Sequence, residues 1–200
     1  MKKQDAKKNI LAIHRYFWPD VPPYAILLRA IASRWVDDGH DVEVLSTQPS
    51  YKPKANLPNC PPWECMDGIK VKRLLLYKNE KNIVQRMMNI ALFSMNCFFR
   101  ILFSHRYDYV MASTVPQVVL GFLCCLTCRM RGIKFIYHCM DIHPEIGRIS
   151  GEFSNRLIFK ILQSLDSWTC NHAYRVIVLS SDMKKSMELR PTSNKIQIEK

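Results

Sequence analysis

The chain has 200 residues, of which 48% are hydrophobic and 23% are charged. These proportions are those of an ordinary globular protein and exclude an intrinsically disordered chain. A chain of this length buries one sizeable core, so we expect a single domain over residues 1–200.

Lysine and arginine outnumber the acidic residues by 29 to 17, which gives a formal net charge of +12 at pH 7. A positive field of this size favours nucleic acid, anionic lipid headgroups or phosphorylated substrates without choosing among them. No basic run is interleaved with aromatic residues, and the densest basic cluster lies near the N-terminus, at residues 2–8. We therefore do not expect nucleic acid as a partner.

The eight cysteines do not indicate a disulfide framework. The N-terminus is polar and basic, without the apolar stretch of a secretory signal, so we expect a cytoplasmic protein with reduced thiols. Cys125 and Cys128 form a CxxC pair inside an apolar segment, where cysteine behaves as a small buried hydrophobe. We therefore expect both in the core and not in a metal or redox site. Cys60 and Cys65 lie in a proline-rich loop, and no second pair at zinc spacing accompanies them, so we predict no metal site.

The first third of the chain predicts strands that alternate with a helix. Residues 9–14 form a short apolar segment that runs into a proline-rich turn, as a buried strand does. A helix follows from Tyr24, with Leu27, Ile31 and Trp35 on its apolar face and Gly39 at its C-terminal end. Residues 41–45 predict a second strand.

Prolines dominate the next segment. Residues 47–66 contain five of them, too many missing N–H donors for a helix or a central strand, so we expect a long surface loop. Residues 69–76 alternate between apolar and basic side chains, which predicts a strand with one solvated face toward an edge of the sheet.

Residues 82–103 predict one long apolar helix. Asn89, Ser94, Asn96 and Arg100 interrupt it, which argues against a membrane-spanning helix because spanning requires about 20 predominantly apolar residues. Two alternatives stay open: the helix lies on a membrane surface, or it packs between the sheet and solvent.

The rest of the chain continues the alternation of strands and helices. The predicted strands are residues 108–112, 134–138, 176–179 and 196–198, and the predicted helices are residues 118–130, an amphipathic segment over 157–168 and a segment from residue 182. Together the elements predict an α/β, Rossmann-like fold with a mainly parallel sheet and helices on both faces.

Ligands of such sheets bind at the carboxyl ends of the strands. The loops at these ends are residues 15–23, 47–63, 113–117, 139–151 and 180–183. A dehydrogenase-type Rossmann enzyme is excluded, because its glycine-rich turn after the first strand is missing and no glycine precedes Gly39.

Several of these loops carry motifs in a fixed order. The motifs are YFWPD at residues 16–20, GHDV at 39–42, TQPSY at 47–51 and DIHPE at 141–145. In combination they resemble the N-terminal, acceptor-side domain of family-4 glycosyltransferases, which have the GT-B fold, and especially the bacterial branch that builds exopolysaccharide, capsule and O-antigen. The resemblance extends over essentially the whole chain.

The resemblance implies a function. In that family the N-terminal domain holds the acceptor, the C-terminal domain binds the nucleotide sugar, and the sugar is transferred with retention of configuration between them. We therefore expect the acceptor-binding half of a retaining, nucleotide-sugar-dependent transferase for cell-surface polysaccharide or glycolipid synthesis. The donor domain is not within these 200 residues, so we expect no cofactor on this chain and no activity from it alone. The alternative is a non-catalytic acceptor-binding subunit that needs a separate donor-domain partner.

The catalytic candidates are Asp141 and Glu145, which stand four residues apart in a loop at a strand end. Carboxylates in a loop at a strand end orient an acceptor hydroxyl or accept its proton; for Glu145 the alternative is that it complements a helix N-terminus. The sequence departs from the family in two places. Pro22 and Pro23 stand where many relatives have Gly-Gly, and Met140 precedes Asp141 where relatives have histidine.

Five residues are predicted to bind the acceptor. They are His14, Tyr24, Ser113, His143 and Arg148. His143 takes the place of the missing histidine, and the planar fork of Arg148 suits a phosphate of a lipid-linked acceptor. His138, which ends an apolar strand, is predicted to be a packed core residue. The expected partners are a lipid-linked or saccharide acceptor and an anionic membrane, with the protein peripheral on the inner face of the plasma membrane.

Overall fold

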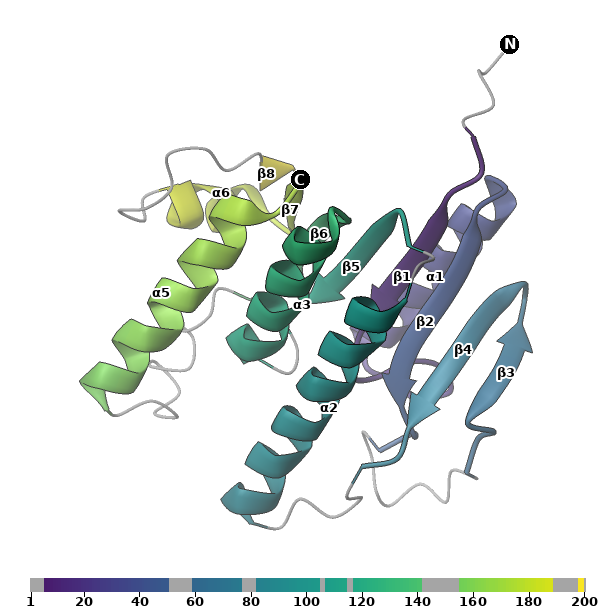
Figure 1. The fold of residues 1–200 in the computed structure, drawn as a ribbon, viewed down its shortest axis with the longest axis horizontal. Coiled ribbons are helices and arrows are strands. Elements are labelled where there is room, and N and C mark those ends of the chain that lie inside the picture. Colours follow the sequence, from purple (N-terminus) through teal and green to yellow (C-terminus); the bar gives the residue numbers. More distant parts are fainter. Residues whose placement is uncertain are drawn as a thin grey trace.

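The computed structural model describes residues 6–50, 59–76, 82–104, 107–114, 117–141, 155–188 and 198–199 (Figure 1). These residues form one sheet of eight strands in the order β3-β4-β2-β1-β5-β6-β7-β8. The strands are β1 (Asn9–Ile13), β2 (Asp41–Thr47), β3 (Trp63–Met66), β4 (Ile69–Leu74), β5 (Tyr109–Ser113), β6 (Lys134–Cys139), β7 (Arg175–Val178) and β8 (Ile198–Glu199). The helices are α1 (Pro23–Asp37), α2 (Ile83–Phe103), α3 (Gln117–Arg131), α5 (Arg156–His172) and α6 (Ser181–Glu188).

Neighbouring strands pair in parallel throughout, except that β3 pairs with β4 in the antiparallel sense. The central strands β1 and β5 are buried along almost their whole length, as strands covered on both faces are. The predicted α/β, Rossmann-like architecture with a mainly parallel sheet is confirmed.

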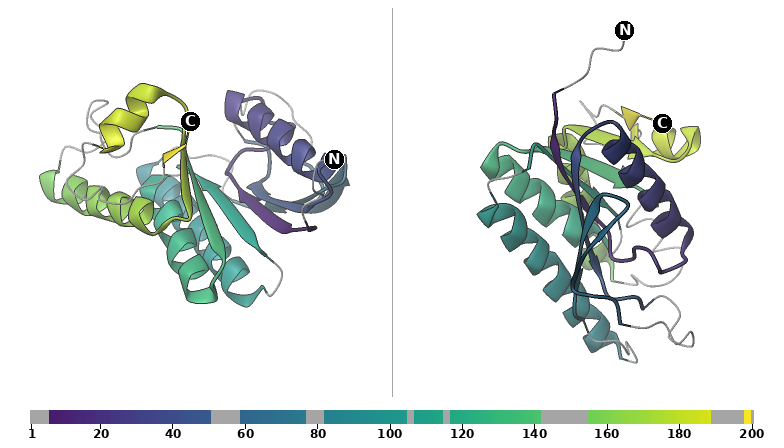
Figure 2. Two further views of the ribbon diagram at one scale, coloured as in Figure 1. Left: turned by 90° about the horizontal axis from the view of Figure 1, so that it is seen from above. Right: turned by 90° about the vertical axis from the view of Figure 1, so that its right-hand side faces the viewer.

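Helices cover both faces of the sheet (Figure 2). Helix α1 lies on one face, over a cluster that includes Leu28, Val44 and Val71. Helices α2, α3 and α5 pack side by side on the other, over a larger cluster. Successive side chains of a strand point to opposite faces, so the single sheet contributes residues to both cores.

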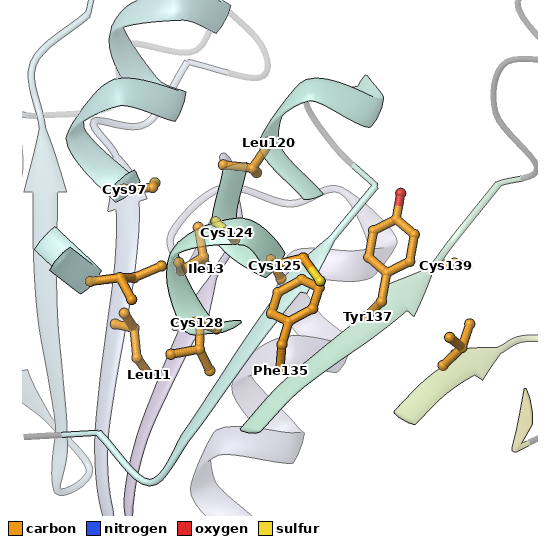
Figure 3. Close-up of a cluster of buried hydrophobic side chains, with 14 of the residues drawn as sticks. Leu11, Ile13, Cys97, Leu120, Cys124, Cys125, Cys128, Phe135, Tyr137 and Cys139 are labelled. Atoms are coloured by element: carbon orange, nitrogen blue, oxygen red, sulfur yellow. The ribbon is translucent and has the colours of Figure 1, made fainter. Parts of the chain in front are cut away.

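Cysteines contribute much of the larger core (Figure 3). Cys97, Cys124, Cys125 and Cys128 are each exposed by 1% or less. The prediction that Cys125 and Cys128 are core residues is confirmed, and burial raises the pKa of the Cys125 thiol to about 12. Protonated thiols in an apolar environment act as small hydrophobes and are poor nucleophiles.

Three sequence-based expectations were wrong in detail. Residues 63–66 are not loop: they form the edge strand β3, whose antiparallel partner β4 supplies hydrogen bonds that local composition does not reveal. On α1 the buried stripe runs through Ala25, Leu28 and Ala32, whereas Leu27 is 39% exposed. Small residues face the sheet there because they let the helix approach the strands closely. In α5, which contains the predicted amphipathic segment over 157–168, the apolar residues Leu157, Ile158 and Ile161 are exposed and do not form its buried face.

Candidate functional site

The carboxyl ends of β1, β5 and β6 meet at one edge, because β5 lies between the other two strands. His14 directly follows β1, Ser113 is the last residue of β5, and His138 pairs with Ser113 across the β5–β6 ladder. Tyr24 reaches the same place from the first turn of α1. We call His14, Tyr24, Ser113 and His138 the strand-end cluster.

Two hydrogen bonds join the members of the strand-end cluster. His14 Nδ1 bonds to Ser113 Oγ, and the Tyr24 hydroxyl lies 2.9 Å from His138 Nδ1. The Tyr24 ring meets the two imidazole rings edge-on, with centroid distances of 4.3 Å to His14 and 5.3 Å to His138. All four residues are at most 6% exposed. The cluster is therefore a rigid polar layer at the strand ends.

Burial keeps the cluster uncharged at neutral pH. It lowers the pKa of His14 to about 3, assisted by the nearby His138, and it lowers the pKa of His138 to about 4. Burial also raises the pKa of the Tyr24 phenol, with a smaller contribution from Cys139. A protonated phenol can donate its hydrogen to His138 Nδ1. Neutral imidazoles keep one donor and one acceptor nitrogen each, which suits the recognition of sugar hydroxyls.

Removal of the Tyr24 hydroxyl tests this arrangement. Tyr24→Phe is expected to lower the free energy of unfolding by about 2 kcal/mol, because it leaves His138 Nδ1 buried without its partner. Urea unfolding would measure the loss. Tyr174→Phe removes a hydroxyl from a tyrosine that is 41% exposed and is expected to change stability by less than about 0.5 kcal/mol. If Tyr24→Phe and Tyr174→Phe lower the free energy of unfolding equally, the Tyr24–His138 hydrogen bond does not have the predicted effect on stability.

The sequence-predicted site residues fall into two groups. His14, Tyr24 and Ser113 are brought together, and the cluster bonds engage His14 Nδ1, the Tyr24 hydroxyl and Ser113 Oγ. Asp141 lies two residues after β6 and is exposed. The adjacent backbone is anchored to the end of β5, because the Met140 N–H donates to Thr114 Oγ1 over 3.2 Å. Asp141 therefore presents its carboxylate to solvent at the same edge as the cluster.

His143, Glu145 and Arg148 lie outside the described residues. Their roles stay predictions. His138 is buried as predicted, but the sequence did not reveal its bond to Tyr24, a residue 114 positions away.

Motif residues in two other loops fix the backbone of the site edge. The Asp20 carboxylate is 1% exposed and accepts the Ser50 N–H over 3.2 Å. The Gln48 side-chain amide donates to the Cys60 carbonyl and accepts the Cys60 N–H, over 2.8 and 3.0 Å. Sequence reasoning did not give Asp20 and Gln48 these roles. Their polar side chains in loops at strand ends were the available signal.

The N-terminus of α1 is poorly suited to bind phosphate. Pro22 is its N-cap residue, no side chain caps it, and Pro23 contributes no N–H donor. The described residues also hold no group of three or more histidine, cysteine or acidic side chains that could bind a metal ion. The chemistry this part of the site offers is hydrogen bonding by neutral groups beside one exposed carboxylate.

Residues 25–194 match the family model described as a glycosyl transferase 4-like domain. The chain belongs to this family. The predicted family is thereby confirmed, while the model does not distinguish the bacterial polysaccharide branch within it. A sequence search among curated proteins found no match.

The glycosyl transferase 4-like domain also has a structural neighbour. It is similar to the sucrose-phosphate synthase of Thermosynechococcus elongatus, with a TM-score of 0.61 and 13% sequence identity. The similarity covers 96% of this chain and 47% of that one, so the chain spans about half the length of the neighbour. At this identity the likeness supports the fold alone.

Proposed function

We propose that this domain holds the acceptor for a retaining, nucleotide-sugar-dependent glycosyltransferase that makes cell-surface polysaccharide or glycolipid on the cytoplasmic side of the membrane. The observation that carries the proposal is the convergence of the strand-end cluster and Asp141 on one edge of a glycosyl transferase 4-like domain.

The geometry suits an acceptor sugar. Asp141 offers a solvent-exposed carboxylate that can accept a hydrogen bond from the attacking hydroxyl. The hydrogen bonds to Ser113 and Tyr24 use the Nδ1 atoms of His14 and His138. The Nε2 atoms of both histidines take no part in these two bonds. Bonds to neutral groups at a fixed edge orient a sugar without adding charge to the site.

The donor must be bound elsewhere. Transfer from a nucleotide sugar releases a diphosphate, whose growing negative charge needs basic groups or helix N–H donors. The proline-blocked start of α1 provides none. We propose that a second domain, on this polypeptide or on a separate subunit, binds the nucleotide sugar and completes the cleft.

Asp141→Asn tests the acceptor site. The probe is a panel of simple saccharides coupled to a short polyprenyl diphosphate, and binding is followed by saturation-transfer NMR. We expect the substitution to weaken binding of the preferred saccharide about tenfold or more, because a charge-assisted hydrogen bond is lost. Asp37→Asn, at the exposed end of α1, is the matched control and is expected to bind like the unsubstituted chain. Binding that Asp141→Asn leaves unchanged would refute the role of this residue.

A partner experiment tests the donor half. Affinity capture of the chain from its own cells should recover a nucleotide-sugar-binding domain. This domain is expected either on the same polypeptide or on a separate protein. Full sugar transfer from a nucleotide sugar by the 200-residue chain alone would contradict the proposed division of labour.

A further inference from the structure

Helix α2 is apolar on its outward face as well as on the face that packs against the sheet. Ten of the positions whose side chains the structure describes are exposed, and eight of these carry apolar side chains: Val84, Met87, Met88, Ala91, Leu92, Met95, Phe99 and Phe103. The other two are Arg86 and Asn96. The inward face buries Phe93, Cys97 and Ile101 in the larger core, together with the polar residues Asn89 and Ser94. Amphipathic surface helices place their polar residues outward, so the outer face of α2 needs a cover.

The apolar face is large and continuous. Val84, Met87 and Phe103 are 62%, 64% and 73% exposed, at the two ends of the helix. Figure 1 shows α2 at one end of the row formed by α5, α3 and α2, with its N-terminal turns extending beyond α3. No helix among the described residues is long and apolar enough to cross a membrane. An exposed apolar face of this kind marks an interaction surface.

Basic groups border the C-terminal end of this face. A pocket of about 680 Å³ lies between α2 and the β2–β4 part of the sheet, and its lining includes Lys70, Lys72, Arg100, Trp63 and Glu43. The sequence of α2 contains no acidic residue. This end of the helix therefore has three basic side chains beside an apolar strip.

The charges in the pocket are only partly neutralised. Arg100 Nη2 donates to both Glu43 carboxylate oxygens, over 2.7 and 2.9 Å, and Lys70 pairs with Asp41 over 2.7 Å. The Lys72 amine instead lies over the Trp63 ring, 4.6 Å from its centroid, and no acidic side chain of the described segments forms an ion pair with it. Burial, followed by the charge of Arg100, lowers the pKa of Lys72, and the nearby Glu43 carboxylate offsets part of this shift. An incoming anion would relieve that repulsion.

We propose that α2, with Trp63 and Lys72, docks on the surface of an anionic phospholipid bilayer. The apolar side chains enter the boundary between headgroups and acyl chains, and the pocket beside Lys72 receives a lipid phosphate. A bilayer fits better than a protein partner because it supplies a broad apolar layer and negative charge together, the two features that this face complements. The proposal does not depend on the acceptor site.

Sedimentation with lipid vesicles tests the docking, in the absence of any sugar acceptor. The chain is expected to bind vesicles of equimolar phosphatidylcholine and phosphatidylglycerol, and to bind phosphatidylcholine vesicles much more weakly. Leu92→Ser/Phe99→Ser should weaken binding to the anionic vesicles about tenfold or more, because two inserted side chains are lost. Lys72→Glu should weaken it about tenfold and reduce its dependence on salt.

The chain offers matched controls for both kinds of substitution. Ile26→Ser/Leu27→Ser changes two exposed apolar residues of α1, on the opposite face of the sheet, and Lys185→Glu reverses an exposed charge on α6. Both are expected to bind anionic vesicles like the unsubstituted chain. Circular dichroism and thermal unfolding check that each variant is folded. If Leu92→Ser/Phe99→Ser does not fold, the Lys72→Glu variant tests the proposal.

Three outcomes would overturn the docking proposal. The unsubstituted chain fails to bind anionic vesicles; the α1 control loses as much binding as the α2 variant; or the chain self-associates through α2 and ignores vesicles, which would identify a second copy as the cover. Sugar binding by the same preparation separates a failure of docking from a failure of the proposed function.

Discussion

Lowering the pH from 6.5 to 4.5 is expected to reduce the free energy of unfolding by about 5 kcal/mol through His14 and His138 alone. In the unfolded chain both imidazoles bind a proton below their ordinary pKa of 6.5. In the folded chain they stay neutral, because burial holds their pKa values at about 3 and about 4. The unfolded state therefore binds more protons over this window, and stability falls as the pH falls.

Urea unfolding across this pH range measures the effect. Each histidine contributes about 1.4 kcal/mol per pH unit while its folded form is neutral and its unfolded form is charged. His14→Gln removes one such group, so the slope of stability against pH should fall by that amount, even though the variant is less stable at pH 7. An unchanged slope in His14→Gln would contradict the neutral, buried state of this residue.

Gly121→Ala is expected to destabilise the domain by about 2 kcal/mol, although alanine is the better helix former by about 1 kcal/mol. A Cβ at position 121 of α3 would lie 2.6 Å from Cε2 of Tyr137. That ring cannot move aside easily, because it is fully buried and its hydroxyl donates to Asp166 Oδ1 over 2.7 Å. The clash outweighs the gain in helix propensity.

Thermal unfolding provides the measurement, with an expected fall in melting temperature of about 5 °C. A double-mutant cycle with Tyr137→Leu is the control: once the ring is gone, Gly121→Ala should cost much less than it does in the unsubstituted chain. If Gly121→Ala raises the melting temperature in the unsubstituted chain, helix propensity dominates and the packing argument is wrong.

The order of the elements was predictable from the sequence because it depends on local patterns. Runs such as residues 9–14 and 108–112 are too short and too apolar for a surface helix, and the intervening segments have helical spacing. Gly39, which was expected to end the first helix, has a positive φ of 89°. The edge strand β3 was missed because it is formed by pairing with β4, and its own composition resembles a loop.

The sequence placed candidate residues at the carboxyl ends of strands, but it could not pair them. His14 and Ser113 are 99 residues apart, and Tyr24 and His138 are 114 apart. Their bonds exist because the strand order places β5 between β1 and β6. The contrast between this buried cluster and the exposed Asp141 likewise depends on depth at the sheet edge, which no local pattern encodes.

For the long helix, too, the sequence and the tertiary structure determined different features. Its apolar content and its polar interruptions were visible in residues 82–103, and they left two alternatives open, packing against the sheet or lying on a membrane. The sequence by itself determined the fold class, the family motifs and the existence of this helix, because each rests on residues close together in the chain. Only the tertiary structure decided that Asn89 and Ser94 turn inward while Met87 and Phe99 face out, because the side of a helix that meets the sheet is fixed by distant contacts.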